Sequence, residues 1–258
     1  MPTFESNGAT IYYEVAGEGL PLIFTHGASW NHKQWIKQVA YFKDRCQVIT
    51  WDVRGHGYSS LPPGPVDPEH FSVDLVALLD HLHLETGVLC GLSMGGHISL
   101  QTAIRYPERV KGLILIGTPC SNTFNLYEKI AVPINRFFNR LLPLKLSGHL
   151  QAKFLSKFNP DNYQYIMEAV SMLSPEAWHR IWFAVTRMES KHDLHKVKCP
   201  TLLLIGDHDT LTGRQQLYMH RQIANSELKV IPNAHHGTNL DNPEAVNQAI
   251  SEFIAQLN

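Results

Sequence analysis

The sequence predicts an α/β fold, with a mostly parallel sheet flanked by helices and interrupted by a helical insertion. Two observations carry this prediction. Apolar runs of strand length alternate with helical periodicity before residue 120 and again after residue 190, and such alternation produces right-handed βαβ units and parallel sheets. Between these parts the pattern is helical throughout. We therefore expect a core domain of residues 1–120 and 191–258 and a helical domain of residues 121–190.

Apolar runs recur along the first half of the chain, and they are rich in β-branched and aromatic residues, as is typical of buried strands. Strands are predicted for residues 9–15, 21–25, 46–51, 88–91 and 110–116. Between them apolar residues recur at helical spacing, as at Trp35, Val39 and Phe42 with Ile36 beside them. Helices are predicted over residues 31–42, after Asp67-Pro68, and over residues 95–106.

The helical segment is divided by prolines, each of which is expected to end a helix: Pro133, Pro143, Pro160 and Pro175. It holds eleven of the chain's 25 Phe, Tyr and Trp residues: Phe124, Tyr127, Phe137, Phe138, Phe154, Phe158, Tyr163, Tyr165, Trp178, Trp182 and Phe183. A small helical unit cannot bury all these rings in its own core. Some should face the sheet and roof a pocket, although packing between the two domains would also account for them.

The sheet resumes after the insertion. Strands are predicted at residues 199–205 and 228–231, a helix at residues 214–224, and a last helix from Asn242-Pro243 onward. A loop before that last helix carries the adjacent His235 and His236.

The most informative segment is Gly91-Leu92-Ser93-Met94-Gly95, which stands between a predicted strand and a predicted helix. A serine on such a sharp turn has strained backbone geometry. Side chains two positions before and after it would collide, which explains the two glycines. The turn exposes the hydroxyl at a helix N-terminus, where backbone N–H groups favour a developing anion. This context predicts that Ser93 is a nucleophile.

Composition argues against several classes of function. The chain has 258 residues, of which 44% are hydrophobic and 17% charged, and a formal net charge of −1. A globular domain with a substantial core fits these values, and no basic surplus indicates nucleic-acid binding. No apolar run approaches the ~20 residues of a membrane span. The N-terminus has no basic segment followed by an apolar one, so a secretory signal is not expected. We expect a cytoplasmic protein without a nucleic-acid or membrane partner.

Cysteines and histidines form no metal motif. Cys46, Cys90, Cys120 and Cys199 are far apart and mostly lie in apolar runs, which favours buried free thiols. The fifteen histidines form neither a His-Glu-x-x-His pattern nor a cluster with zinc spacing. We therefore expect neither a metal nor another cofactor.

Five segments stand in a recognisable order: His26-Gly27, Asp52 to Ser59, Gly91 to Gly96, Gly206-Asp207-His208-Asp209, and His236 followed by Asp241-Asn242-Pro243-Glu244. In this order and spacing the chain resembles the α/β-hydrolase superfamily over nearly its whole length. Carboxylesterases and 3-oxoadipate enol-lactonase-like members are the most similar in overall layout. The resemblance implies the α/β-hydrolase fold, a cap domain at the helical insertion, and a catalytic triad in the chain order serine, acid, histidine.

The resemblance also implies roles for single residues. The family histidine commonly stands five residues before an acid that precedes x-Pro-Glu, which here selects His236. His235 occupies the usual glycine position, so the reverse assignment stays open. The orienting acid is typically the last residue of Gly-x-x-Asp, which is Asp209. Asp207 is expected to hold the turn through backbone N–H groups.

Attack by Ser93 would create an oxyanion that needs two N–H donors. Met94 should supply one, and Ala28, after the His26-Gly27 strand end, should supply the other. His26 is expected to be structural. The aromatic residues predicted to line an acyl pocket are Trp30, Phe124, Phe138 and Trp182.

The expected function is therefore a serine hydrolase that cleaves carboxylic esters or lactones of small molecules through an acyl-enzyme. Carbon–carbon hydrolases and cofactor-free haloperoxidases keep the same triad, and some receptors of this fold use it with slow turnover. These alternatives stay open. Epoxide hydrolases and dehalogenases place an aspartate where this chain has Ser93. The expected partner is a small ester or lactone, and the protein could be a monomer or a homodimer.

Overall fold

The computed structural model describes residues 1–257, which contain one eight-stranded sheet of order β1-β2-β4-β3-β5-β6-β7-β8. The strands are β1 (Thr3–Ser6), β2 (Ala9–Ala16), β3 (Leu20–Thr25), β4 (Cys46–Trp51), β5 (Gly87–Leu92), β6 (Val110–Ile116), β7 (Thr201–Gly206) and β8 (Ser226–Ile231). The pairs β1–β2 and β2–β4 are antiparallel and the others are parallel. The predicted mostly parallel sheet is confirmed. The short edge strand β1 is an addition that no apolar run indicated.

Strand β5 lies in the middle of the sheet, in register with β3 through Leu22↔Val88 and with β6 through Leu92↔Ile116. All of its residues are buried, as expected for a continuous apolar strand covered on both faces. The turn that follows β5 is therefore held on both sides by neighbouring strands.

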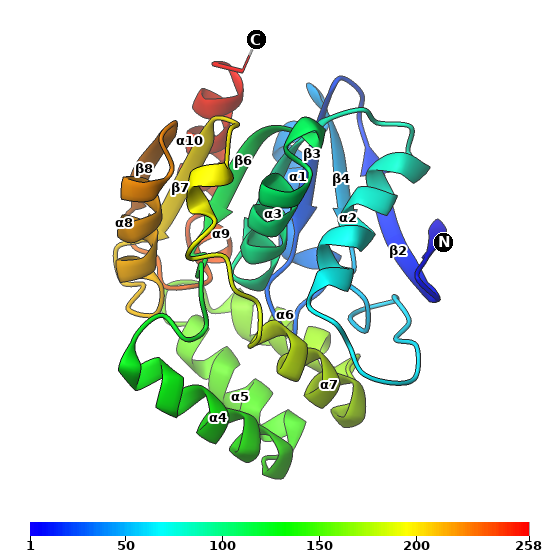
Figure 1. Ribbon diagram of the computed structural model, residues 1–258, viewed down its shortest axis with the longest axis vertical. Coiled ribbons are helices and arrows are strands. Elements are labelled where there is room, and N and C mark those ends of the chain that lie inside the picture. Colours follow the sequence, from blue (N-terminus) through cyan, green and yellow to red (C-terminus); the bar gives the residue numbers. More distant parts are fainter. Residues whose placement is uncertain (258) are drawn as a thin grey trace.

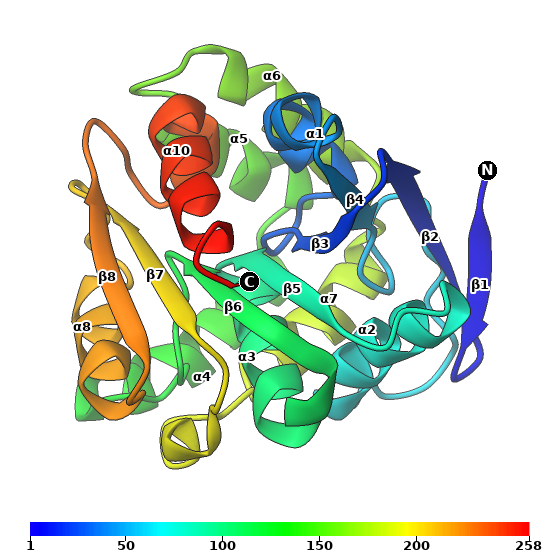
Figure 2. The ribbon, with the colours of Figure 1, turned by 90° about the horizontal axis from the view of Figure 1, so that it is seen from above.

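Helices cover both faces of the sheet (Figures 1 and 2). On one face lie α2 (Glu69–His81), α3 (Met94–Arg105) and α8 (Gly213–Gln222), and on the other lie α1 (Ile36–Phe42) and α10 (Pro243–Ile254). The core divides accordingly. Ile23 packs in one cluster with Leu75 of α2, whereas the adjacent Leu22 packs in a second cluster with Trp35 and Ile250. This is the alternation expected of neighbouring strand residues.

Some element boundaries differ from the predictions. The helix expected over residues 31–42 is a 3₁₀ turn, η1 (His32–Trp35), followed by α1. Trp35 and Phe42 are buried there, but Ile36 is exposed. A short helix, α9 (Thr238–Asp241), lies in the expected loop before α10. Further 3₁₀ turns are η2 (Pro107–Arg109) and η3 (Leu194–Lys196).

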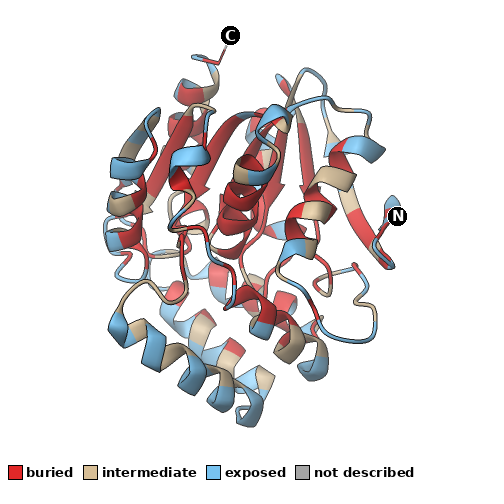
Figure 3. Ribbon diagram, viewed as in Figure 1, coloured by how far each residue is buried: buried red, intermediate tan, exposed pale blue. Residues whose placement is uncertain are grey.

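Between β6 and β7 the chain forms α4 (Leu126–Leu141), α5 (Leu144–Leu155), α6 (Asp161–Ser171) and α7 (Pro175–Val185). Three of the four prolines stand where α5, α6 and α7 begin, but Pro133 lies inside α4, so the expected break there is wrong. These helices gather at one end of the sheet (Figure 1), and buried residues concentrate in the sheet and the helices against it (Figure 3). The division into a core and a cap domain stays a prediction.

Candidate active site

Ser93 stands on the turn between β5 and α3, with φ 53° and ψ −113°. This positive φ is strained for a residue with a side chain. The turn is fixed by the Ser93 N–H, which donates to the Ile116 carbonyl (2.9 Å), and by the Ser93 carbonyl, which accepts from the His97 N–H (3.0 Å). A Cβ at Gly91 would collide with the Gly95 backbone, and a Cβ at Gly95 would collide with the Thr25 carbonyl. Both glycines are thus required by close backbone approach, as predicted.

His236 lies in the loop after β8 and meets Asp209, which lies in the loop after β7. The two are joined by a 3.0 Å hydrogen bond between His236 Nδ1 and Asp209 Oδ2. Asp209 also accepts from Thr212 Oγ1 (2.7 Å) and from the Leu211 N–H (2.8 Å). Burial acts to raise the pKa of Asp209, but the hydrogen bond from His236 and those of the loop outweigh it and lower the pKa to about 2. The carboxylate is therefore charged and orients the His236 ring with Nε2 free.

Ser93 and His236 both lie beside the turn at Gly117. Gly117 follows Ile116, the partner of the Ser93 N–H, and a Cβ on it would stand 3.2 Å from His236 Nδ1 and 3.1 Å from Asp209 Oδ2. No hydrogen bond joins Ser93 Oγ to the His236 ring within residues 1–257. Catalytic hydrogen bonds are often long in ligand-free proteins and shorten in the substrate complex.

The alternative acid and base have different surroundings. The ring of His235 packs against Phe158, with centroids 4.4 Å apart, and does not reach Asp209. Asp207 accepts from the backbone N–H groups of Asn233 and Ala234, both at 3.0 Å. Asp207 thus holds the loop that leads to the histidines, which is the role expected for it.

The two predicted oxyanion donors follow two neighbouring strands of the sheet, β3 and β5. Met94 is the first residue of α3, where N–H groups have no partner inside the helix, and Ala28 lies in the loop after β3. Neither N–H donates a hydrogen bond in the part of the chain that the structure describes. Both groups are therefore free to donate to an oxyanion.

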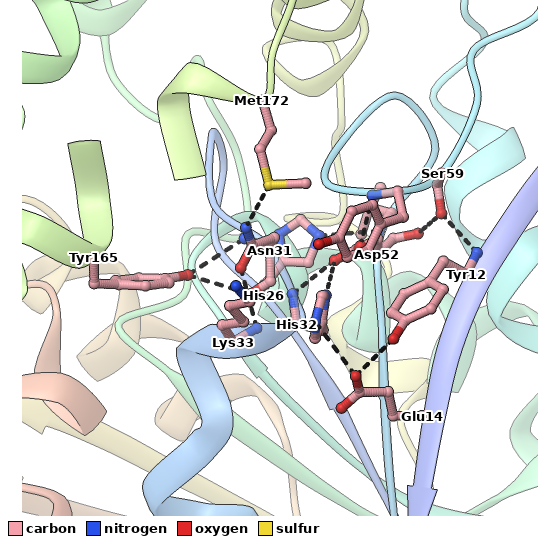
Figure 4. A network of polar contacts seen from close by, with 12 residues as sticks. Tyr12, Glu14, His26, Asn31, His32, Lys33, Asp52, Ser59, Tyr165 and Met172 are labelled. Atoms are coloured by element: carbon pink, nitrogen blue, oxygen red, sulfur yellow. Dashed lines mark hydrogen bonds and ion pairs between the residues drawn. The ribbon is translucent and has the colours of Figure 1, made fainter. Parts of the chain in front are cut away.

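A buried polar network beneath this loop holds it in place (Figure 4). His26 accepts from the Val53 N–H through Nε2 (3.0 Å) and contacts the Gly27 carbonyl through Nδ1 (2.8 Å). Burial lowers the pKa of His26 to about 4, so its ring is neutral near pH 7. Asp52 Oδ1 accepts from the N–H and the ring of His32 at 2.7 and 2.9 Å. His26 is structural, as expected, and Asp52 is structural too.

Three contacts to this loop were not indicated by any sequence pattern. Ser29, at φ 65°, donates its N–H to His56 Nε2 (3.3 Å) and its hydroxyl to Gln151 of α5 (3.1 Å). The Tyr165 hydroxyl of α6 donates to the Asn31 carbonyl (3.2 Å) and accepts from the Asn31 N–H (3.3 Å). The insertion is thus hydrogen-bonded directly to the candidate oxyanion loop (Figure 4).

The aromatic residues predicted to line a pocket lie in different places. Trp30 is buried in the core, Phe124 packs on Tyr218 with centroids 5.2 Å apart, and Phe138 is exposed beside Phe137. Trp182 lines a cavity of ≈ 500 Å³ between α4 and α7. Their substrate-binding role stays a prediction.

A smaller cavity of ≈ 110 Å³ adjoins the candidate oxyanion loop at Ser29. Its other lining residues come from the insertion and are uncharged: Asn139, Leu144, Ser147, Gly148, Gln151, Val170 and Trp178. The sequence pattern did not reveal it, because five separate segments enclose it.

Within residues 1–257, no group of three or more His, Cys, Asp and Glu side chains is arranged to hold a metal ion. None of the helices in that range combines the length and apolar character needed to cross a bilayer.

Comparison with known proteins places these features in a family. Residues 21–243 match the family described as serine aminopeptidase, S33. The chain is 28% identical to 3-oxoadipate enol-lactonase 2 of Acinetobacter baylyi, covering 92% of this chain and 89% of that protein. It is 26% identical to the pimeloyl-[acyl-carrier protein] methyl ester esterase of Nitrosospira multiformis, covering 91% and 94%. A thermophilic esterase from Thermogutta terrifontis, solved with malate bound, superposes with a TM-score of 0.87 at 29% identity, covering 99% and 97%. The chain belongs to the serine aminopeptidase S33 family of the α/β-hydrolase superfamily.

Proposed function

We propose that this protein is a serine hydrolase that cleaves carboxylic esters or lactones of small molecules. The observation that carries the proposal is the 3.0 Å contact between His236 Nδ1 and Asp209 Oδ2 at the sheet edge that also bears Ser93. A carboxylate that binds Nδ1 fixes the tautomer in which Nε2 accepts a proton, which is what an otherwise weak serine nucleophile requires.

In the proposed reaction, His236 Nε2 takes the Ser93 proton as Oγ attacks the carbonyl carbon. The carbonyl electron pair moves to oxygen, and the N–H groups of Ala28 and Met94 donate to this oxyanion. The oxyanion collapses, the carbon–oxygen ester bond breaks, and the alcohol leaves with the proton from His236. Water then loses a proton to His236 and attacks the acyl-Ser93, which releases the acid and restores the serine.

Two observations support the substrate class. The relatives include proteins named as an enol-lactonase and a methyl ester esterase, so both ester types occur among similar chains. The cavity at Ser29 is small and lined only by uncharged side chains. Such a lining favours a short, neutral acyl or alcohol group over one that carries a carboxylate, because no cation is present there to pair with it.

The proposal is tested by steady-state hydrolysis of p-nitrophenyl esters of increasing acyl length and of simple lactones. We expect wild-type turnover, best for short acyl chains, and a fall in kcat of about 10³-fold or more in Ser93→Ala. Ser171→Ala, which changes an exposed serine of α6, is the control and should keep full activity. Full turnover in Ser93→Ala would refute the assignment. A folded wild-type protein without turnover would favour carbon–carbon substrates or a receptor.

A further inference from the structure

Helix α4 exposes its apolar side. None of its residues is buried. Six large apolar side chains, here called the α4 apolar face, are between 50% and 77% exposed: Leu126, Tyr127, Ile130, Ile134, Phe137 and Leu141. Their spacing of mostly three or four residues places them along one side of the helix.

The polar side of α4 is the side that contacts the protein. Asn135 Oδ1 accepts from Trp182 Nε1 (2.8 Å), and Arg136 Nε donates to Thr186 Oγ1 (2.6 Å) at the end of α7. At 3.6 residues per turn these two residues lie opposite the α4 apolar face. A surface helix ordinarily does the reverse and turns its apolar side to the core. A contiguous exposed apolar patch marks a contact surface.

The position of α4 leaves this face accessible. Figure 1 shows α4 at the outer rim of the insertion, at the end of the molecule away from the C-terminus, and Figure 3 shows its ribbon without a buried residue. Apolar exposure continues into the following chain, where Leu142, Leu146 and Leu150 are each more than 40% exposed.

Cations surround the face. Residues 126–157 contain six Lys or Arg and one Glu, a formal charge of +5, whereas the remaining residues contain 16 Lys or Arg and 22 Asp or Glu, a formal charge of −6. Five of the six cations are exposed, and no ion pair engages them within residues 1–257: Lys129, Arg140, Lys145, Lys153 and Lys157. Lys129 and Arg140 flank the α4 apolar face on the helix, where long stems can lie on an apolar surface with their charges outside it.

We propose that the α4 apolar face docks on the surface of an anionic phospholipid bilayer. A helix with one apolar side and basic flanks lies in the plane of a membrane interface, its apolar side among the acyl chains and its cations near lipid phosphates. A second copy fits less well, because a symmetric contact through this face would bring two +5 segments together. The docking is separate from the proposed ester hydrolysis and does not depend on it.

The expectation of no membrane partner rested on the absence of a spanning run, and a helix that lies on the surface needs none. Docking through α4 would put the helical insertion, and with it the cavity at Ser29, next to the lipid.

The test is co-sedimentation of the full chain carrying Ser93→Ala, which keeps hydrolysis out of the readout. Vesicles of phosphatidylcholine with about one third phosphatidylglycerol are compared with phosphatidylcholine alone at low and high salt. We expect binding to the anionic vesicles that weakens with salt and falls about tenfold with Ile130→Ser plus Ile134→Ser. Lys129→Glu plus Arg140→Glu should weaken it as well. The matched control is Leu217→Ser plus Val230→Ser, which removes exposed apolar residues elsewhere and should bind like the parent.

If the parent protein does not bind anionic vesicles, the proposal is overturned. It is also overturned if the α4 variants bind these vesicles as strongly as the control variant does. Sedimentation velocity tests whether a second copy of the chain covers the face instead. If the parent protein is a dimer and the variant Ile130→Ser plus Ile134→Ser is a monomer, the face belongs to a second copy and the membrane assignment is overturned. Circular dichroism establishes that each variant is folded, so that lost binding reflects the lost surface.

Discussion

Asp209 and Asp207 are two residues apart, yet their surroundings give them different tasks. Asp209 is buried and contacts the His236 ring at 3.0 Å, whereas Asp207 accepts from the backbone N–H groups of Asn233 and Ala234 in the next loop. The Gly-x-x-Asp pattern suggested this division, and the hydrogen bonds now give it a physical basis. One carboxylate orients the proposed base, and the other fixes the loop that presents it.

Asp209→Asn should therefore reduce kcat by about 10³ to 10⁴-fold, because an amide can stabilise the wrong tautomer of His236. Asp207→Asn is the matched control and should lower the melting temperature with little change in kcat, since it affects only the turn. The measurements are ester kinetics and thermal unfolding for both variants. Equal kinetic losses in the two would show that Asp209 has no special link to the reaction.

Ser29 and Ser93 both have positive φ without being glycine, at 65° and 53°. Such strain persists only where the surroundings fix it. At Ser93 the surroundings are two glycines that the sequence displays. At Ser29 they are His56 and Gln151, which are 27 and 122 residues away along the chain. Only the first of these sites has a local signature.

Helix α6 supports the candidate oxyanion loop through one hydroxyl. Tyr165 is partly buried and bonds both the N–H and the carbonyl of Asn31. Burial raises the pKa of Tyr165, so its hydroxyl keeps its proton at every working pH. Tyr165 is a positioning residue, because it would act through the loop and not on the substrate.

Tyr165→Phe should lower kcat by about five- to tenfold with little change in KM, since lost hydrogen bonds of this kind are worth about 1 kcal/mol. Tyr163→Phe is a matched control on the same helix, because its hydroxyl bonds only His149. Steady-state kinetics on one p-nitrophenyl ester compares the two. A change confined to KM, or an equal loss in the control, would remove the proposed link between α6 and the loop.

The loop after β4, helix α2 and strand β1 meet at a buried ion pair. Arg54 binds Asp74 of α2 through Nε and a terminal nitrogen, both at 2.6 Å, and Ser6 of β1 donates to the same carboxylate at 2.6 Å. Both charged side chains are almost fully buried. Removal of one partner would leave the other charge buried without compensation.

Asp74→Ala should therefore lower the free energy of unfolding by about 3–5 kcal/mol. Asp80→Ala, on the same helix, removes the exposed partner of Arg109 and should cost at most about 1 kcal/mol. Urea unfolding measures both values. Similar small losses would mean that water reaches Arg54 in the variant.

At the scale of the whole molecule, three buried histidines make stability depend on pH. Burial lowers the pKa of His26 to about 4, and of His56 and His97 to about 3. In the unfolded chain the same rings take up protons near pH 6.5. The unfolded state thus binds more protons between these values, so their contribution to stability is present above pH 6.5 and is lost as the pH falls. Asp241 acts oppositely, since burial raises its pKa to about 6 and the folded state then holds an extra proton between about pH 4 and 6.

The free energy of unfolding should fall from pH 7 to pH 5, with a slope of about 1.4 kcal/mol per pH unit for each extra proton bound by the unfolded state. Urea titrations at several pH values measure this slope. His97→Gln should reduce it by the contribution of one proton, whereas His83→Gln, at an exposed turn, should leave it unchanged. A flat dependence between pH 7 and 5 would contradict the neutral state of the buried rings.

Local signals in the sequence predict the sheet and most of the flanking helices: apolar runs, helical spacing and glycines that only a tight turn requires. The choice of Asp209 and His236 came instead from the resemblance to the α/β-hydrolase superfamily, and the structure brings the two side chains together. The same local signals wrongly predicted that a helix ends at Pro133, and they did not indicate strand β1. Helix α4 continues through Pro133, although proline has no N–H to donate to the preceding turn. Contacts with the rest of the protein stabilise the helix there, and no local sequence pattern shows those contacts.

The folded arrangement alone fixes how the insertion meets the loop at Ser29 and Asn31, and which side of α4 stays exposed. Both depend on contacts between segments more than 40 residues apart, such as Gln151 with Ser29 and Asn135 with Trp182. Periodicity shows that a helix has an apolar side but not what covers it. Burial is a property of the assembled chain, because it depends on which surfaces meet when distant segments pack.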